Sequence, residues 1–431
     1  MRMLRPCLLP LTACWGLLLA PVPSSRCTGQ DPVASSSSDA RSLDQLLAAT
    51  SPATAPRVLL DAILARKHPG NQDRRADGSA IAAALGEAEA LVEFVQWHAA
   101  AGERTTALVL RPHREPQRVD LGDATTLRQA IVTHLQLLAR TQRPLDAASL
   151  RLANATSHRL GALVLQPLEP LLAGCSRVHF APDGDLLALP FDSLPTSRTD
   201  TLLLESLDVR MLVCGSELVA PPSPAGRDLL VIDGGSFDLP ESSREARTIA
   251  TLWERAQRGQ VLQRSSAQLA TPRDDLHGWE FVHLAGVPRA LTAETPDERP
   301  APPSRPTAAA DAALRRRVPT DLELTDCRLI VVSTTDTPLE NEATPGATIG
   351  RWREVLRRAG ARSSLLAAWP LEGAATRELL TGFWRELLAD DDPCLALRRA
   401  KLARLEANRA AHSQTMPGTW AGFQLFTHAA R

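Results

Sequence analysis

Short apolar runs dominate the second half of the chain and alternate with segments of helical periodicity. Such runs occur at residues 177–181, 228–233, 281–285, 327–332 and 364–369, each followed by a turn or a polar loop. Strands that are apolar on both faces are typical of parallel sheets covered by helices, whereas half-buried strands alternate in polarity. The pattern therefore predicts an α/β fold with a mixed, mostly parallel sheet and helices on both faces.

Helices and turns are predicted between these strands. Gly360 is expected to cap the helix predicted at residues 350–359. Residues 420–426 are expected to form a terminal strand. The strand at 177–181 ends in Pro182-Asp183-Gly184, a turn sequence, and residues 186–190 are expected to return as its hairpin partner. The predicted helices cover residues 241–253, 350–359, 374–388 and 395–409.

The first half of the chain predicts a smaller unit. Residues 106–110 and 118–121 have the character of strands, and residues 127–140 carry apolar side chains at helical spacing. We therefore expect a small α+β unit over residues 58–160, an antiparallel meander that leads into helices. The main domain is then expected over residues 161–431.

The N-terminus has the features of an export signal. Arg2 and Arg5 precede an apolar run at residues 7–22, an arrangement typical of secretory signal peptides and too short and interrupted for a membrane span. This predicts a signal peptide at 1–25 and a Ser-, Ala- and Pro-rich linker at 26–57. The protein is then exported to the periplasm or outside the cell. If the segment is instead a misplaced start, we expect a cytoplasmic protein. Membrane association is expected only if the N-terminal segment stays uncleaved.

Composition excludes several classes of function. A net charge of -1 gives no electrostatic reason to expect a nucleic-acid partner. The seven cysteines form no CxxC pair, so a zinc site is not expected. Gly234-Gly235 lacks the pattern of a phosphate-binding loop, and we expect no cofactor.

Residues 290–320 are rich in Pro, Ala and Arg, which predicts a flexible insert.

Several segments of the chain resemble one known family when they are taken in order. Residues 178–184, followed by Leu189-Pro190-Phe191, resemble an entry motif of a strand, a Pro-Asp-Gly turn and a Leu-Pro-Phe segment. Residues 359–370 resemble a late strand that ends in tryptophan, and residues 396–400 and 420–423 resemble C-terminal signatures. These segments are similar to the CHAT domain family, relatives of caspases and separases. The resemblance runs from about residue 58 to the end and implies a caspase-like peptidase fold.

The resemblance also implies where a catalytic pair would stand. In the family, one strand ends His-x-Ala-x-His-Gly, with the second histidine as the base, and the next core strand ends Ser-Ala-Cys, with the nucleophile last. In this chain residues 283–288 are His-Leu-Ala-Gly-Val-Pro and residues 333–335 are Ser-Thr-Thr. Val287 and Thr335 therefore occupy the histidine and cysteine positions, and no catalytic residue is expected.

The chemistry of peptide hydrolysis explains why valine and threonine at these two positions would prevent catalysis. A thiol attacks an amide carbonyl as the thiolate, and a neighbouring base takes its proton, a task that valine cannot perform. His283 matches the family's first histidine and lies about 13 Å along an extended strand from Val287, so we expect it to have a structural role. His283, Ser333, Thr334 and Asp336 are expected to line a cleft where the strands end.

Two hypotheses on function follow. The first is a catalytically inactive peptidase homologue that acts by binding a protein or peptide partner. The alternative is an active endopeptidase of the cysteine-peptidase type that uses a non-standard catalytic constellation.

Overall fold

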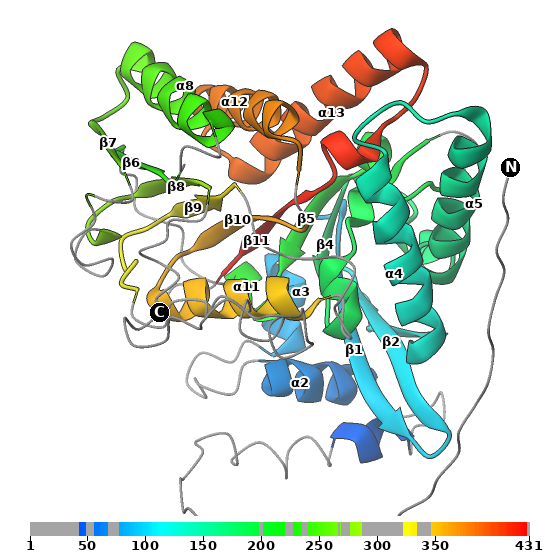
Figure 1. Ribbon diagram of the computed structural model, residues 1–431. Coiled ribbons are helices and arrows are strands. Elements are labelled where there is room, and N and C mark those ends of the chain that lie inside the picture. Colours follow the sequence, from blue (N-terminus) through cyan, green and yellow to red (C-terminus); the bar gives the residue numbers. More distant parts are fainter. Residues whose placement is uncertain are drawn as a thin grey trace, which may run out of the picture.

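An eleven-stranded sheet forms the centre of the molecule (Figure 1). The computed structural model describes residues 43–48, 56–67, 77–197, 201–219, 227–234, 240–265, 268, 276–286, 322–333, 346–369 and 371–428. The strands are β1 (Glu89–Ala99), β2 (Gly102–Leu110), β3 (Gln117–Asp123), β4 (Arg177–Ala181), β5 (Asp208–Leu212), β6 (Leu229–Asp233), β7 (Val261–Ser265), β8 (Phe281–Ala285), β9 (Leu329–Val332), β10 (Ser363–Ala367) and β11 (Phe423–Thr427).

The sheet is mixed and mostly parallel, which confirms the predicted fold class. Its strands are ordered β3-β2-β1-β4-β5-β11-β10-β9-β8-β6-β7. The strands from β10 to β7 are mutually parallel, and so are β1, β4, β5 and β11. The two parallel groups meet at the antiparallel pair of β10 and β11, and β1, β2 and β3 add an antiparallel meander at one edge.

Helices cover both faces of this sheet. Figure 1 shows α8, α12 and α13 on one side and α2, α3 and α11 on the other. No helix among the described residues has the length and apolar character that crossing a membrane requires. The helices are α2 (Pro56–Lys67), α3 (Gly78–Ala84), α4 (Ala124–Arg140), α5 (Ala147–Val164), α6 (Glu169–Leu172), α7 (Leu203–Ser206), α8 (Pro240–Ala256), α11 (Ala347–Ala359), α12 (Gly373–Asp390) and α13 (Pro393–His412).

The meander is continuous with the main sheet, because β1 pairs in parallel with β4. Alternate residues of β1 enter two different cores. Val92 and Phe94 pack into the main core, whereas Leu91 and Val95 pack with side chains of α2 and α3 on the opposite face. The alternation follows from the two-residue period of a strand. The predicted unit at 58–160 thus shares its sheet with the residues that follow it.

The prediction that residues 186–190 form a hairpin partner of β4 is wrong. Residues Gly184–Ala188 form a 3-10 helix, η2, and the neighbours of β4 are β1 and β5. Asp183 caps η2 by accepting a hydrogen bond from the backbone N–H of Gly184, whose φ of 56° turns the chain out of the strand direction. An apolar run of this length does not by itself distinguish a strand from a buried helical turn.

Strand β5 lies in the middle of the sheet, although its sequence gave no apolar run. Asp208 and Arg210 interrupt it, and both charges are compensated in the structure. Arg177 Nε donates to Asp208 Oδ2 at 2.6 Å, and Arg210 Nη2 donates to Asp392 Oδ2 at 2.8 Å. Burying a charge is tolerated when it is paired and hydrogen-bonded, so these contacts allow a charged strand at the centre of the fold.

A buried histidine between α4 and α5 makes the stability of this fold depend on pH. His134 is 1% exposed, and its Nδ1 lies 3.4 Å from Ser157 Oγ. Burial lowers the pKa of His134 from 6.5 to about 4, because a charged imidazole would lose its hydration there.

The sign of this effect follows from linkage. The unfolded chain takes up the His134 proton first, so the stabilisation is complete above pH 6.5 and is lost as the pH falls towards 4. Through His134 the parent is expected to lose roughly 3 kcal/mol of stability as the pH falls over this range. The variant His134→Leu lacks this group, so its loss of stability should be smaller by that amount. Urea unfolding at pH 7 and pH 4.5 measures the difference. An unchanged loss of stability in the variant would contradict the assignment.

Candidate functional site

The carboxyl ends of the neighbouring strands β6, β8 and β9 are joined by hydrogen bonds. The backbone N–H of Gly234 donates to Ala285 O at 2.8 Å. The N–H of Gly286 donates to Ser333 Oγ at 3.0 Å, and the N–H of Ser333 donates to Leu284 O at 3.0 Å. Open α/β sheets bind their ligands at this end of the strands. We therefore treat the strand exits as the candidate site.

Gly286 is required at this edge by its conformation and by its surroundings. Its φ is 83°, in the left-handed region that L side chains rarely adopt. A Cβ at this position would lie 3.2 Å from Ser242 Oγ, near the start of α8. The chain can therefore turn out of β8 closely against α8 only with glycine here.

The structure describes two of the six positions named from the sequence. His283 lies within β8, and Ser333 follows β9 directly. The hydrogen bond between Gly286 and Ser333 joins the last described residues before the two positions of the catalytic pair, the dyad positions Val287 and Thr335. The other four positions lie outside the described residues: Val287, Thr334, Thr335 and Asp336.

His283 is enclosed, and both of its ring nitrogens are engaged. Its exposure is 0%, Nε2 lies 2.8 Å from Glu245 Oε1, and Trp384 Nε1 donates to Nδ1 at 3.2 Å. Because an indole N–H can only donate, Nδ1 accepts, and Nε2 carries the hydrogen given to Glu245. Neither nitrogen of His283 is therefore free to take a proton from a nucleophile at the strand exit.

The partners of His283 come from two helices and were not found from the sequence. Glu245 belongs to α8 and Trp384 to α12, and both side chains are buried. The Trp384 ring also packs edge-on against Trp253 and Phe281, with centroids 5.7 Å and 6.0 Å apart. This aromatic cluster holds the imidazole in place against β8.

Burial disfavours the thiolate form of every cysteine that the structure describes. The pKa of Cys214 and that of Cys394 are each raised to about 12, and the pKa values of Cys175 and Cys327 are raised as well. Desolvation is the largest cause in each case. A thiol with a raised pKa is a poor nucleophile at neutral pH, so these four thiols are not suited to catalysis.

Ser333 supplies a hydroxyl group at the joined exits of β8 and β9. The residue is 4% exposed, and within the described part of the chain its Oγ is hydrogen-bonded to the N–H of Gly286. A serine needs a neighbouring base to act as a nucleophile, and this contact is with a donor.

The described residues also contain no group of three or more His, Cys, Asp or Glu that could hold a metal ion.

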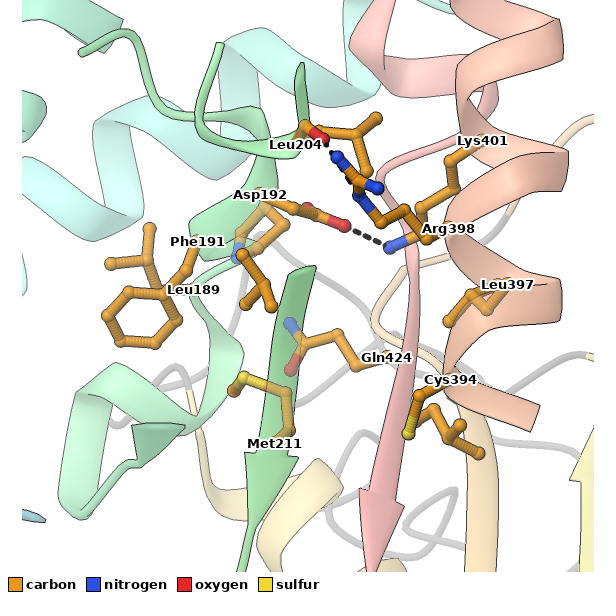
Figure 2. A pocket seen from close by; sticks show the side chains of 13 residues that line it. Leu189, Phe191, Asp192, Leu204, Met211, Cys394, Leu397, Arg398, Lys401 and Gln424 are labelled. Carbon is orange, nitrogen blue, oxygen red and sulfur yellow. Dashed lines mark hydrogen bonds and ion pairs between the residues drawn. The ribbon is translucent and has the colours of Figure 1, made fainter. Parts of the chain in front are cut away.

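A small cavity lies elsewhere, between β5, β11, α13 and the 3-10 helix η3 (Phe191–Ser193) (Figure 2). Its volume is about 30 Å³, enough for one or two water molecules. Lys401 Nζ contacts Asp192 Oδ2 there at 2.5 Å, and Arg398 Nε donates to Leu204 O at 3.1 Å. The cavity is too small for an organic ligand, and its polar groups connect α13 to η3 and to α7.

The same contacts bring two of the family-like segments together in space. Asp192 follows the Leu-Pro-Phe segment, and Lys401 follows the α13 segment at 396–400. Lys401 is one of two lysines in the chain, and the other, Lys67, is also ion-paired, with buried Glu93 at 2.7 Å. Lys67 therefore connects α2 to strand β1, and Lys401 connects α13 to η3.

Comparison with known proteins identifies the family of this α/β protein. The family model of the CHAT domain matches residues 154–428. The chain therefore belongs to the CHAT domain family. No curated protein matches the chain.

Solved structures of caspase-like cysteine peptidases are similar to the chain at low sequence identity. Two separase–securin complexes from Saccharomyces cerevisiae match with 6% and 7% identity and TM-scores of 0.44 and 0.47, covering 81% and 88% of this chain. The chain spans about a third of the separase chains, 31% and 34%. The Arg-specific cysteine proteinase gingipain R matches with 10% identity and a TM-score of 0.36, covering 71% of this chain and 74% of its own.

The enclosed position of His283 predicts a large stability effect. His283→Leu leaves the buried Glu245 carboxylate and the Trp384 indole N–H without this partner, and we expect a loss of about 3 kcal/mol. The double substitution His283→Leu with Glu245→Leu removes the buried charge and should be closer to the parent in stability. Urea unfolding checks both variants. Equal stability of parent and single variant would show that the imidazole does not hold these elements together.

The Asp192–Lys401 pair gives a second prediction about stability. Lys401→Met leaves Asp192 uncompensated in a closed environment, and we expect a loss of about 3 kcal/mol. Arg399→Met is the matched control on the same helix, because Arg399 is 44% exposed and pairs with Asp390 at the surface. The control should cost less than about 1 kcal/mol. Thermal unfolding of both variants compares them, and similar costs would contradict a structural role for the buried pair.

Proposed function

We propose that this chain is a catalytically inactive CHAT-domain protein that binds a protein or peptide segment at the carboxyl ends of β8 and β9. The observation that carries the proposal is the state of His283. It is the histidine that β8 carries, and its two nitrogens are committed to Glu245 and Trp384. Valine and threonine stand at the two positions that the family uses for its base and nucleophile, Val287 and Thr335.

Two further properties of the described residues support the same proposal. The described thiols are held in environments that raise their pKa. The hydroxyl of Ser333 accepts a backbone hydrogen bond and has no base beside it among the described residues. Nucleophilic catalysis needs an activated nucleophile within reach of a base, and neither is supplied by these groups.

The scaffold that would hold a peptide is nevertheless retained. The exits of β6, β8 and β9 remain joined through Gly234, Gly286 and Ser333. The carboxyl ends of parallel strands are where open α/β sheets bind ligands, and this holds without catalytic chemistry, so binding is the function that we propose. Export of the protein remains an expectation from its N-terminal sequence.

Restoring the dyad tests whether chemistry alone is missing. We expect the parent to cleave no member of a diverse peptide library, and the double variant Val287→His with Thr335→Cys to gain cleavage. The reason is that a cysteine beside an imidazole forms a thiolate at neutral pH. Mass spectrometry of the library after incubation at equal enzyme concentration measures both.

The single variants Val287→His and Thr335→Cys are the matched controls, and each should stay far below the double variant because the two residues act as a unit. Cleavage by the parent that survives purification to homogeneity would establish the alternative, an active endopeptidase with a non-standard constellation. A double variant that folds but gains nothing would contradict a scaffold intact except for its dyad.

A further inference from the structure

A groove between α8 and α12 carries an unusual concentration of arginine. Its volume is about 710 Å³, within the range of ligand-binding clefts. Five of its nine lining residues are arginines, and three are threonines. The arginines are Arg244, Arg247 and Arg255 of α8 and Arg377 and Arg385 of α12.

The arginines form two stripes along neighbouring helices. On α8 the lining positions recur every three to four residues, and on α12 they are four apart, so each set lies on one helical face. The helices pack against each other, as Figure 1 shows. Both start at the carboxyl end of the sheet, α8 after β6 and α12 after β10, and therefore run in the same direction.

All but one of the acidic side chains within these helices lie away from the groove. On α12, Glu378 pairs with Arg404 of α13, while Glu386 and Asp390 both pair with Arg399 of α13. On α8, Glu245 is buried against His283, and exposed Glu254 does not line the groove. The carboxylates of α12 thus face α13, and its arginines face α8.

One carboxylate neutralises part of the groove at one end. Glu241 pairs with Arg244 and with Arg377. Arg247, Arg255 and Arg385 are exposed and have no carboxylate partner within the described part of the chain. Thr248 and Thr381 donate their hydroxyl hydrogens to the carbonyls of their own helices at 2.7 Å and 2.6 Å. Three guanidinium groups are therefore left to bind an external anion.

We propose that the α8–α12 groove binds an acidic peptide segment of a partner protein. Guanidinium groups bind carboxylates through paired hydrogen bonds. The stripe from Arg244 to Arg255 spans about 16 Å along α8 at the helical rise per residue. An extended peptide covers that length with about five residues. The preferred ligand is a short extended run of Asp and Glu.

The lining distinguishes this ligand from other polyanions. Leu252 is its single apolar residue, and no aromatic side chain lines it. Single-stranded nucleic acids are bound by basic grooves in which aromatic rings stack with bases. Membrane surfaces are bound by faces that insert apolar side chains. The groove binds independently of the strand exits, so the proposal holds whether or not the dyad positions retain any activity.

Fluorescence anisotropy with the full chain tests the proposal. The probe is a fluorescein-labelled peptide with five consecutive glutamates between glycine–serine flanks. The triple variant Arg247→Gln, Arg255→Gln and Arg385→Gln removes the three unpaired charges and should weaken binding by about tenfold or more. The matched control, Arg140→Gln, Arg151→Gln and Arg159→Gln, removes the same charge from exposed positions on α4 and α5 and should bind like the parent.

Three outcomes would overturn the proposal. The first is no binding of the acidic peptide to the parent. The second is equal weakening in the groove variant and the control variant, which would indicate a general charge effect. The third is groove-dependent binding of a mixed-sequence DNA strand or of phosphatidylserine vesicles without groove-dependent binding of the peptide. Peptide cleavage assays are a separate measurement, so failure here leaves the proposed function of the strand exits unaffected.

Discussion

The hydrogen-bonded imidazole of His283 is the contact on which the arrangement of this molecule depends. It joins the interior strand β8 to two helices, because one ring nitrogen donates to Glu245 of α8 and the other accepts from Trp384 of α12. All three side chains are buried, so loss of any one leaves polar groups of the others without a partner. The geometry of β8, α8 and α12 is thereby fixed as one unit.

Two surfaces follow from that unit. The helices α8 and α12 both begin beside the carboxyl ends of the strands, and Gly286 packs there against the start of α8. The outer faces of the same helices carry the arginine groove. A histidine that serves as an anchor is therefore unavailable as a base, and it supports both surfaces for which we propose peptide binding. The proposed inactive homologue is physically consistent with this arrangement, because the anchor His283 and the expected base position Val287 are different residues of one segment.

The sequence predicted the buried strands well because covered parallel strands are apolar on both faces. β4, β6, β8, β9, β10 and β11 were all found this way. β5 was missed because Asp208 and Arg210 interrupt its pattern, and the ion pairs that permit them exist only in the folded chain. The run at 186–190 was mistaken for a strand because a buried 3-10 turn is equally apolar.

The candidate site was predictable only in part. The positions of Val287 and Thr335 came from resemblance to the family and lie outside the described residues. The partners of His283 are 38 and 101 residues away along the chain, a separation that no local pattern encodes. The arginine stripes of α8 and α12 were present in the sequence, but the groove exists only because the two helices pack side by side.

We expect the folded chain to have no activated nucleophile at its strand exits. Intact-protein mass spectrometry checks this after the folded protein is incubated with electrophilic peptide probes of the kind that label cysteine peptidases covalently. We predict an unmodified mass under conditions that fully label an active caspase. A single stoichiometric adduct that maps to Ser333, Thr334 or Thr335 would contradict the account.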